Sequence, residues 1–419
     1  MSATCDGRQF YGWRIVGAAF VLAIFGWGVG FYGPPIYLHA VREARGWPVA
    51  LVSAAVTGHF LVGALVIANL PSLYRRLGVP FVTKAGAISL GVGICGWATA
   101  GEPYQLFFAA LFGGAGWVAL GAAAVNAIIA PWFVRARPAA LGMAYNGASI
   151  GGVVFSPLWV AAIAHLGFPA ASAVIGVLTA IVVWTLTDLY FTKSPDQLGL
   201  TPDGDATGLP EFSVTCPLAR PLTGSSLWRS PRFLTLSAGM ALGLFAQIGL
   251  LAHLFSLLVP ALGAQIAGLA AGGATAAAIA GRTMVGWLMP VGADRRLIAC
   301  GSYLIQIVGS IVLAIAGGND VTLLLVGTLL FGAGIGNATS LPPLIAQAEF
   351  VKADVARVVP LIIAIAQASY AFAPAAFGLI REFAPQEIGD STGAAPYVFM
   401  AAALAQALAI SVFLLGRRR

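Results

Sequence analysis

Arg282 is the residue whose type and position most clearly suggest chemistry. It lies in the apolar stretch 277–289, AAIAGRTMVGWLM, and precedes the basic turn at Arg295 by roughly 20 Å of helix. In a membrane, that depth is near the midplane of a hydrocarbon layer about 30 Å thick. A guanidinium keeps its charge there at a high cost, which makes Arg282 a candidate for function. Its planar fork can donate two parallel hydrogen bonds to a carboxylate.

The acidic residues support an anionic ligand for Arg282. None of the 15 Asp and Glu falls in the middle of an apolar segment, and Asp188 and Glu349 stand near segment ends. We therefore expect the negative charge near Arg282 to come from a ligand. The competing interpretation is that Arg282 binds backbone carbonyls or extends toward the turn at Asp294.

Two histidines are the other ionisable candidates at depth. His59, in VTGHFLVGAL, falls near the expected midplane, and His253 falls in the outer part of the segment GLLAHLFSLL. Imidazole gains and loses a proton near physiological pH, so either residue could couple a ligand to a proton gradient. The alternative for each is a neutral histidine bonded to a neighbouring helix.

Asn126, Tyr145 and Tyr370 are further polar side chains in apolar segments, where hydrogen bonding between helices is the commoner role.

Composition indicates an integral membrane protein. Of the 419 residues, 59% are hydrophobic and only 9% are charged, against about a quarter charged in soluble proteins. The net charge of +7 does not indicate a nucleic-acid partner, because the basic residues stand at the ends of apolar segments. The four cysteines are far apart and lack metal-ligand spacing. No nucleotide, hydrolase or metalloprotease motif occurs, so we expect no cofactor, no metal and no enzyme activity.

The apolar segments predict an all-α membrane protein with twelve transmembrane helices. Most of the 22 Lys and Arg fall on one side if both termini are cytoplasmic, and Arg42, Arg45 and Arg381 are assigned to the outer side. Residues 192–230 are rich in Pro, Gly and polar residues and read as a cytoplasmic linker between six-helix halves at 1–191 and 231–419. The expected spans are 13–38, 49–73, 82–100, 104–130, 138–163, 168–191, 232–258, 263–289, 297–316, 321–346, 357–380 and 395–415.

Short repeats relate the two halves. The tripeptide at Arg75, RRL, recurs at Arg295, and LFG at Leu111 recurs at Leu330, each about 220 residues later, which indicates a duplicated unit. The segment GRTMVGWLMPVGADRR resembles the G-x-x-x-D-R-x-x-R signature of the major facilitator superfamily. The first copy, LPSLYRRLG, departs from it at Tyr74. Gly147, Gly151 and Gly152 before Pro157 are expected to let the fifth helix approach its neighbours closely.

Within the superfamily, the chain resembles the monocarboxylate transporter and oxalate/formate exchanger group. The similarity lies in YGWRIVGAAF, in WFVRARPAALGMAYNGASIGG, in YFTKSPDQLGLTPDG and in the lone arginine of the eighth helix. It implies that Arg282 binds the substrate carboxylate, with Asn126, Tyr145, Tyr370 and His253 as further substrate ligands. Gly33-Pro34-Pro35 and Ala278 replace a lysine and an acid of the animal members, which puts a proton relay of the animal type in doubt.

The sequence thus predicts a secondary transporter that moves a small monocarboxylate together with a proton by alternating access. His59 and His253 are the proton-coupling candidates. The alternatives are a carboxylate or anion exchanger, a drug or metabolite exporter of the same superfamily, and a receptor that binds ligand without flux. We expect a monomer in a bacterial inner (plasma) membrane, with the lipid bilayer, small carboxylates and protons as its partners.

Overall fold

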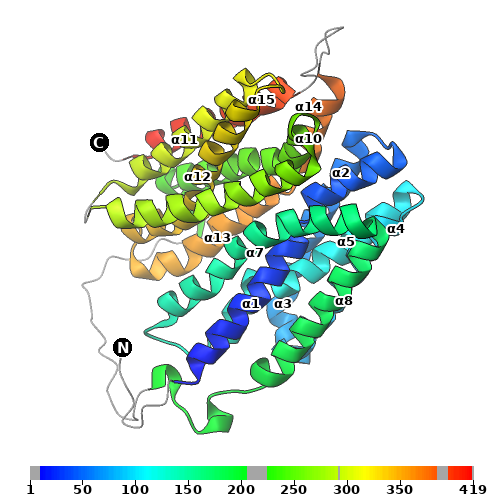
Figure 1. The fold of residues 1–419 in the computed structure, drawn as a ribbon. Coiled ribbons are helices and arrows are strands. Elements are labelled where there is room, and N and C mark those ends of the chain that lie inside the picture. The colour runs from blue at the N-terminus through cyan, green and yellow to red at the C-terminus, as the bar shows by residue number, and fades with distance from the viewer. Residues whose placement is uncertain (1–9, 205–223, 291–292, 385–394, 418–419) are drawn as a thin grey trace. The chain divides into compact units, whose positions relative to one another are not determined.

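The computed structural model describes residues 10–204, 224–290, 293–384 and 395–417, and the regular elements in these ranges are helices (Figure 1). The larger helices are α1 (Gly12–Gly30), α2 (Pro34–Arg45), α3 (Val49–Leu77), α4 (Val79–Thr99), α5 (Pro103–Leu120), α6 (Ala122–Ile129), α7 (Arg137–Leu166), α8 (Phe168–Leu186), α10 (Pro231–Leu288), α11 (Arg295–Ile315), α12 (Val321–Glu349), α13 (Lys352–Tyr370), α14 (Ala373–Phe383) and α15 (Ala395–Leu415).

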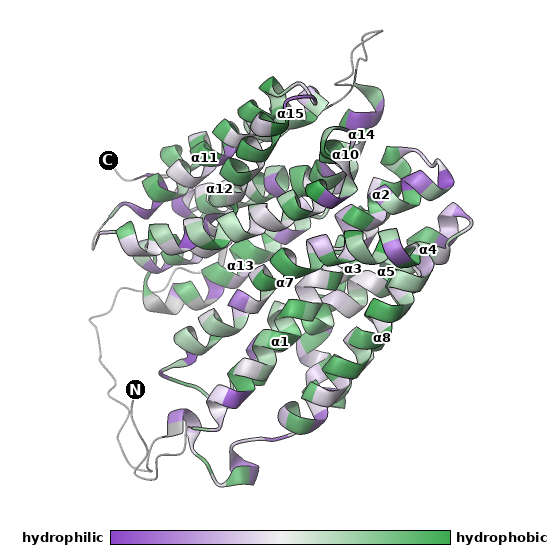
Figure 2. Ribbon diagram, viewed as in Figure 1, coloured by the Kyte–Doolittle hydropathy of each residue, from purple (hydrophilic) through white to green (hydrophobic). Residues whose placement is uncertain are grey.

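Eleven helical stretches in the described residues are long and apolar enough to cross a membrane. Figure 2 shows that hydrophobic residues predominate along these helices and that hydrophilic residues gather mainly toward their ends. The longest stretch, α10, has 58 residues, but Gly263 within it has φ 72° and ψ 161°. Glycine adopts such a backbone without strain, so α10 consists of two helical arms joined at Gly263.

Three expected spans are interrupted. The first is divided into α1 and α2, because Pro34 and Pro35 lack the N–H groups that a continuous helix would need. The fourth breaks at Gly121, whose φ of −84° and ψ of −155° are extended, and α6 begins directly after it. The eleventh breaks between α13 and α14, with a proline in the first turn of α14.

The described parts of the expected linker 192–230 contain short helical turns. Helical turns occur at η2 (Asp196–Leu198), η3 (Pro202–Gly204) and α9 (Gly224–Leu227), while η1 (Thr187–Phe191) ends the preceding span as a π-helix. Residues 205–223 of the linker lie outside the described residues. Isolated turns of this length are common where proline and glycine interrupt longer helices.

The contacts divide the chain into two units. Unit 1 comprises Met1–Pro34, Val62–Phe155 and Ala162–Pro217, and unit 2 comprises Pro35–Leu61, Ser156–Ala161 and Leu218–Arg419. Unit 2 therefore contains α2, the first part of α3 and a short piece of α7 together with the C-terminal helices. Contacts inside unit 2 include the backbone N–H of Ala375, which donates to the hydroxyl of Thr57 over 3.1 Å.

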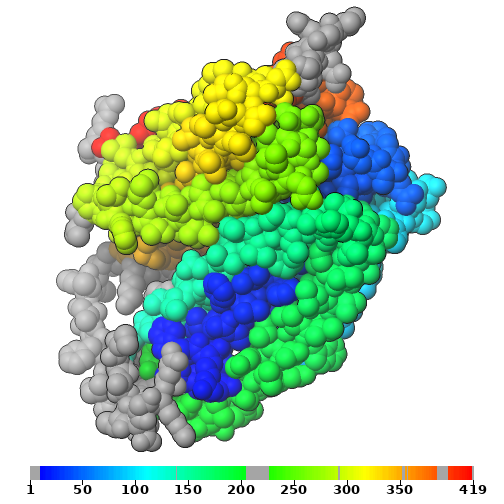
Figure 3. All heavy atoms as spheres, in the orientation of Figure 1, coloured from blue at the N-terminus to red at the C-terminus, as the bar shows by residue number. Residues whose placement is uncertain are grey.

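Small residues bring α1 and α7 together in unit 1, as the sequence predicts for Gly147 and Gly151. A Cβ on Gly147 would lie 2.2 Å from the carbonyl oxygen of Phe20, and a Cβ on Gly151 would lie 2.5 Å from that of Ile24. Both distances are too short for any side chain, so the two backbones touch. Figure 3 shows α1 in dark blue flanked by α7 and α8 in shades of green.

Candidate functional site

Arg282 lies on the second arm of α10, where this arm packs against α12. A Cβ on Gly336 would lie 2.2 Å from the carbonyl oxygen of Ala278, and a Cβ on Gly281 would lie 2.1 Å from that of Ala333. The two helix backbones are therefore in direct contact in the turn that precedes Arg282. This packing depends on glycine at both positions.

The close approach fixes the side chain of Arg282. Its Nε donates to the carbonyl oxygen of Gly336 over 2.9 Å, and the residue is half-buried. This bond is of the kind that the competing interpretation described, and the carbonyl that accepts it belongs to α12. A carbonyl oxygen carries no net charge, so this bond orients the guanidinium without cancelling its charge. An oriented fork of this kind is suited to a planar anion.

Asn126 and Tyr145 form a second group, in unit 1. The Nδ2 of Asn126 donates to the hydroxyl of Tyr145, and this hydroxyl donates to the carbonyl oxygen of Ala122 over 3.1 Å. The indole ring of Trp27 meets the Tyr145 ring at 75°, with 6.4 Å between centroids. The two residues that the sequence proposed separately thus act as one hydrogen-bonded pair that connects α6 with α7.

His253 is fully buried in the first arm of α10. Its Nε2 is 3.0 Å from the carbonyl oxygen of Pro374, and its Nδ1 is 3.3 Å from Nη1 of Arg381. A carbonyl can only accept and a guanidinium can only donate, so the proton of the neutral imidazole lies on Nε2. The structure therefore places His253 against α14, while the contact of Arg282 with Gly336 is to α12.

His59 is buried in α3, and its ring lies 5.3 Å from that of Phe60. The Phe60 ring in turn meets Tyr370 of α13 edge to face, at a centroid distance of 5.9 Å. His59 and Tyr370 are therefore joined through one aromatic side chain. Four of the six predicted residues are thus joined in two pairs, Asn126 with Tyr145 and His59 with Tyr370, while His253 contacts α14 and Arg282 contacts α12.

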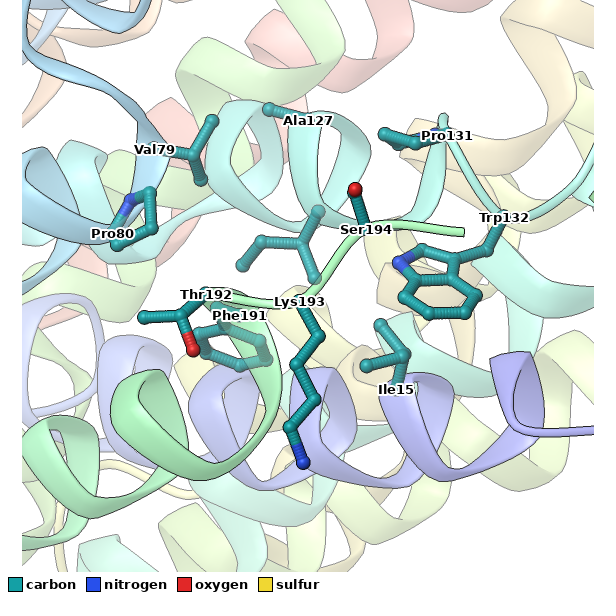
Figure 4. Close-up of a pocket in the computed structure, with 11 residues that line it drawn as sticks. Ile15, Val79, Pro80, Ala127, Pro131, Trp132, Phe191, Thr192, Lys193 and Ser194 are labelled. Carbon is teal, nitrogen blue, oxygen red and sulfur yellow. The ribbon is translucent and has the colours of Figure 1, made fainter. Parts of the chain in front are cut away.

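A cavity of about 230 Å³ in unit 1 contains none of the predicted site residues. Figure 4 shows Val79 and Pro80 across the cavity from Ile15 and Trp132. Lys193, which also lines it, donates from Nζ to the hydroxyl of Tyr11 over 3.2 Å. The lining is mainly apolar and lies where α4, α6 and the end of η1 meet.

Two arginines gain roles that the sequence did not assign. Arg381, assigned to the outer side, donates from Nη1 to the hydroxyl of Ser256 over 2.6 Å as well as to His253. Arg296, assigned to a basic turn, is only 1% exposed and pairs with Glu349. The sequence offered one indication that Arg296 is structural, because it follows Asp294 at the start of a helix. The Asp294 side chain caps this helix by accepting from the backbone N–H groups of Arg296 and Leu297.

The sequence model of the Major Facilitator Superfamily matches residues 18–374. This chain belongs to the Major Facilitator Superfamily. The match covers most of the chain, so the protein is a multi-pass membrane transporter rather than an enzyme. No curated protein matches the sequence of this superfamily member.

Solved transporters share the fold of this superfamily member. The nucleoside transporter NupG is 12% identical, with a TM-score of 0.74 over 98% of this chain and all of that one. A bacterial homologue of the human lysosomal transporter Spinster, inward-facing and occupied, is 14% identical, with a TM-score of 0.73 over 98% and 97% of the chains. A D-xylose–proton symporter is 14% identical, with a TM-score of 0.70 over 96% and 97%. At these identities the likeness establishes the fold alone.

Proposed function

We propose that this transporter moves a small carboxylate across the membrane by alternating access, and that Arg282 binds the carboxylate. The observation that carries the proposal is the bond from Arg282 Nε to Gly336, which holds a permanent cation in place between two touching helices. Because the Arg282 side chain is already oriented, less conformational entropy is lost when a ligand binds. The guanidinium can also donate two parallel hydrogen bonds to the two oxygens of a carboxylate.

The distribution of acids supports an anionic and not a cationic substrate. All 15 Asp and Glu stand at or beyond the ends of the expected spans, whereas Arg282 stands inside one. A carrier of lipophilic cations would be expected to place a carboxylate among its helices, as buried charges need opposite charges. The expected spans therefore lack the carboxylate that an exporter of lipophilic cations would need. The resemblance to the monocarboxylate and oxalate/formate group also favours an anionic substrate.

Proton symport is the favoured mode, with His59 or His253 as the proton carrier. For His253, a proton on Nδ1 would displace the hydrogen bond from Arg381, so its protonation would rearrange α14 against α10. His59 is buried beside Phe60, which contacts Tyr370. Anion exchange remains the second mode, because it needs no titrating group. Asn126, Tyr145 and Tyr370 complete the proposed substrate ligands.

The proposed topology has twelve crossings, with each arm of α10 counted separately on either side of Gly263. Residues 1–191 and 231–419 form the two moving halves, 192–230 is their linker, and both termini are cytoplasmic. The proposed location is a bacterial inner membrane, with the protein acting as a monomer.

Uptake of radiolabelled formate and lactate into proteoliposomes tests the proposal. With acid outside, we expect accumulation that an uncoupler abolishes, and a fall of about tenfold or more in Arg282→Gln, because one charge-assisted pair is lost. Thr283→Ala is the matched control, since the hydroxyl of this exposed neighbour donates to the carbonyl oxygen of Ile279 on its own helix. The proposal fails if Arg282→Gln keeps full uptake, or if D-xylose or uridine is carried and carboxylates are not.

The same assay separates the two modes. Symport predicts that His59→Gln or His253→Gln abolishes pH-driven uptake while exchange of internal for external substrate continues. Exchange predicts uptake that depends on internal substrate and resists the uncoupler.

A further inference from the structure

A group of basic side chains at one end of unit 2 includes His253, a proposed proton carrier, but does not include Arg282. It involves α2, the first arm of α10 and α14, and its members are Arg42, Arg381, His39 and His253. Arg42 and Arg381 lie close enough for their charges to act on each other and on both histidines. Two like charges at this range are unfavourable unless a negative charge comes between them.

The contacts show that three elements converge on this group. Arg381 of α14 donates to Ser256 over 2.6 Å and to Nδ1 of His253 over 3.3 Å, both on α10. The ring of His39 on α2 meets the ring of Phe255 on α10 edge to face, with 5.3 Å between centroids. His39 and Arg42 are three residues apart on α2, so they share one face of that helix.

Two buried polar atoms in this group lack a hydrogen-bond partner. Among the described residues, neither Nδ1 of His39 nor Nε of Arg42 has one, although both atoms are shielded from solvent. Buried donors are nearly always satisfied, so two unsatisfied nitrogens beside two cations indicate a place that a ligand fills. The Nε of an arginine can only donate, and a donor beside positive charge calls for an anion.

Among the described residues, the neighbouring acids Glu43 and Glu382 do not fill that place. Glu43, whose charge acts on His39, is exposed on α2, and Glu382 beside Arg381 accepts the backbone N–H of Val49 over 3.0 Å. Both carboxylates therefore reduce the local positive charge without reaching Nε of Arg42.

We propose that Arg42 and Arg381, with His39, bind a small monovalent anion at the end of unit 2 where α2, α10 and α14 meet. The site takes a halide or a carboxylate of the size of formate, because two guanidinium groups and an imidazole supply several donors over a short span. The proposal goes beyond the proposed transport function and does not depend on the role of Arg282.

Anion-dependent thermal stability of the full chain in detergent tests this site. Sodium formate or sodium chloride is titrated at constant ionic strength against sodium isethionate, a salt of a larger anion, and Tm is followed by tryptophan fluorescence. We expect a saturable rise in Tm with at least one of the two anions. A response to formate alone identifies a carboxylate site, and a response to chloride identifies a halide site. The absence of any saturable rise overturns the proposal.

Arg42→Gln is the decisive variant, since Nε of Arg42 makes no hydrogen bond among the described residues and we expect its replacement to leave the fold intact. We expect the apparent dissociation constant to rise about tenfold or more. Arg45→Gln removes the same charge from an exposed position of the same helix and is the matched control. An unchanged constant in Arg42→Gln, or an equal rise in Arg45→Gln, refutes a specific site.

Arg282→Gln separates this site from the proposed transport site. If the rise in Tm persists in Arg282→Gln and disappears in Arg42→Gln, the anion site stands whatever the substrate of transport is. If the rise disappears in Arg282→Gln and persists in Arg42→Gln, the anion binds only at Arg282 and this inference is overturned, while the proposed function stands.

Discussion

Arg296 and Glu349 form a two-point ion pair at the end of α12 in unit 2. Nε of Arg296 donates to Oε1 over 2.6 Å, and Nη2 donates to Oε2 over 2.9 Å. The same guanidinium also donates to the hydroxyl of Thr235 and to the carbonyl oxygens of Arg232 and Phe413. The chain itself thus satisfies this buried arginine and ties α11 to α10, α12 and α15.

Removing the acid of this pair should be strongly destabilising. Glu349→Gln leaves the Arg296 charge buried at 1% exposure, and we expect the free energy of unfolding to fall by about 3–5 kcal/mol. Thermal unfolding in detergent measures the loss. Asp188→Asn is the control, since Asp188 pairs with Lys84 at the surface and should cost at most about 1 kcal/mol. If both variants lose the same free energy of unfolding, burial does not make the Arg296–Glu349 pair more important for stability than the Lys84–Asp188 pair.

Asp203 should hold the start of the linker against the N-terminus of α7. Its Oδ2 accepts from the backbone N–H groups of Val134 and Arg135 over 3.1 and 2.8 Å, and its Oδ1 accepts from that of Ala136 over 3.1 Å. We expect Asp203→Ala to speed hydrogen exchange of these three amides by about tenfold or more, as charge-assisted bonds are lost. Mass spectrometry of the peptide that covers 133–137 measures the rate.

Two further variants give this test its internal standards. Asp203 has a φ of 62°, which asparagine tolerates better than alanine does, so Asp203→Asn keeps the backbone and one acceptor oxygen. The amide exchange rate in Asp203→Asn should lie between the rates in the wild type and in Asp203→Ala. Asp196→Ala, at an exposed position of η2, should leave the exchange rate unchanged. A rate in Asp203→Ala like that of the wild type would mean that other contacts protect this loop.

The stability supplied by Asp294 should depend on pH. Burial alone would raise the pKa of this carboxyl, but hydrogen bonds from Arg417 and from the N–H groups of Leu297 and Arg296 together lower it below its ordinary value of 3.8. A lowered folded-state pKa stabilises the protein above about pH 4 and loses that effect as pH falls through the folded-state value. Asp294→Ala should therefore cost about 1 kcal/mol at pH 7 and less at pH 3.

Asp294→Asn separates the contribution of the helix cap from that of the ion pair with Arg417. Asparagine also caps helices well, so this variant should lose mainly the pair with Arg417, whose Nε lies 2.5 Å from Oδ2 in the native protein. We expect a smaller loss in Tm than in the alanine variant. A difference between wild type and Asp294→Ala that grows as pH falls would reverse the assigned sign of the pKa shift.

Tyr145→Phe distinguishes a substrate ligand from a link between helices. The hydroxyl of Tyr145 accepts from Asn126 and donates to Ala122, so its removal should reduce the free energy of unfolding by about 1 kcal/mol in either case. If Tyr145 also binds substrate, the KM of carboxylate uptake should rise several-fold while kcat changes little. A lower Tm with an unchanged KM would assign Tyr145 to helix packing alone.

Composition and segment length were sufficient to predict a helical membrane protein, because a bilayer imposes long apolar helices on any chain that crosses it. The breaks were harder to predict. Gly121 and Gly263 are two among 52 glycines, and nothing local marks them as the points where helices divide. The close contacts of Gly147 and Gly151 were predictable because small residues four apart share one helix face.

The candidate site was predictable only residue by residue. Arg282, Asn126 and Tyr145 stand out as polar residues in apolar segments, but their partners come from other helices. The pairing of Asn126 with Tyr145 and the contact of Arg282 with Gly336 depend on tertiary packing, which spacing along one helix does not encode. For the same reason the sequence assigned Arg381 to the outer side only by its place after an expected span, and missed its contacts with His253 and Ser256.

The affinity of the transported carboxylate for the wild type and for Arg282 variants is the most direct test of the account. It is measured by titration calorimetry with Arg42 already replaced by Gln, so that a second anion site does not contribute. We predict weaker binding by about tenfold or more in Arg282→Gln, and an intermediate loss in Arg282→Lys, which keeps the charge but lacks the fork. Binding of wild-type strength in Arg282→Gln would contradict the claim that this arginine holds the substrate.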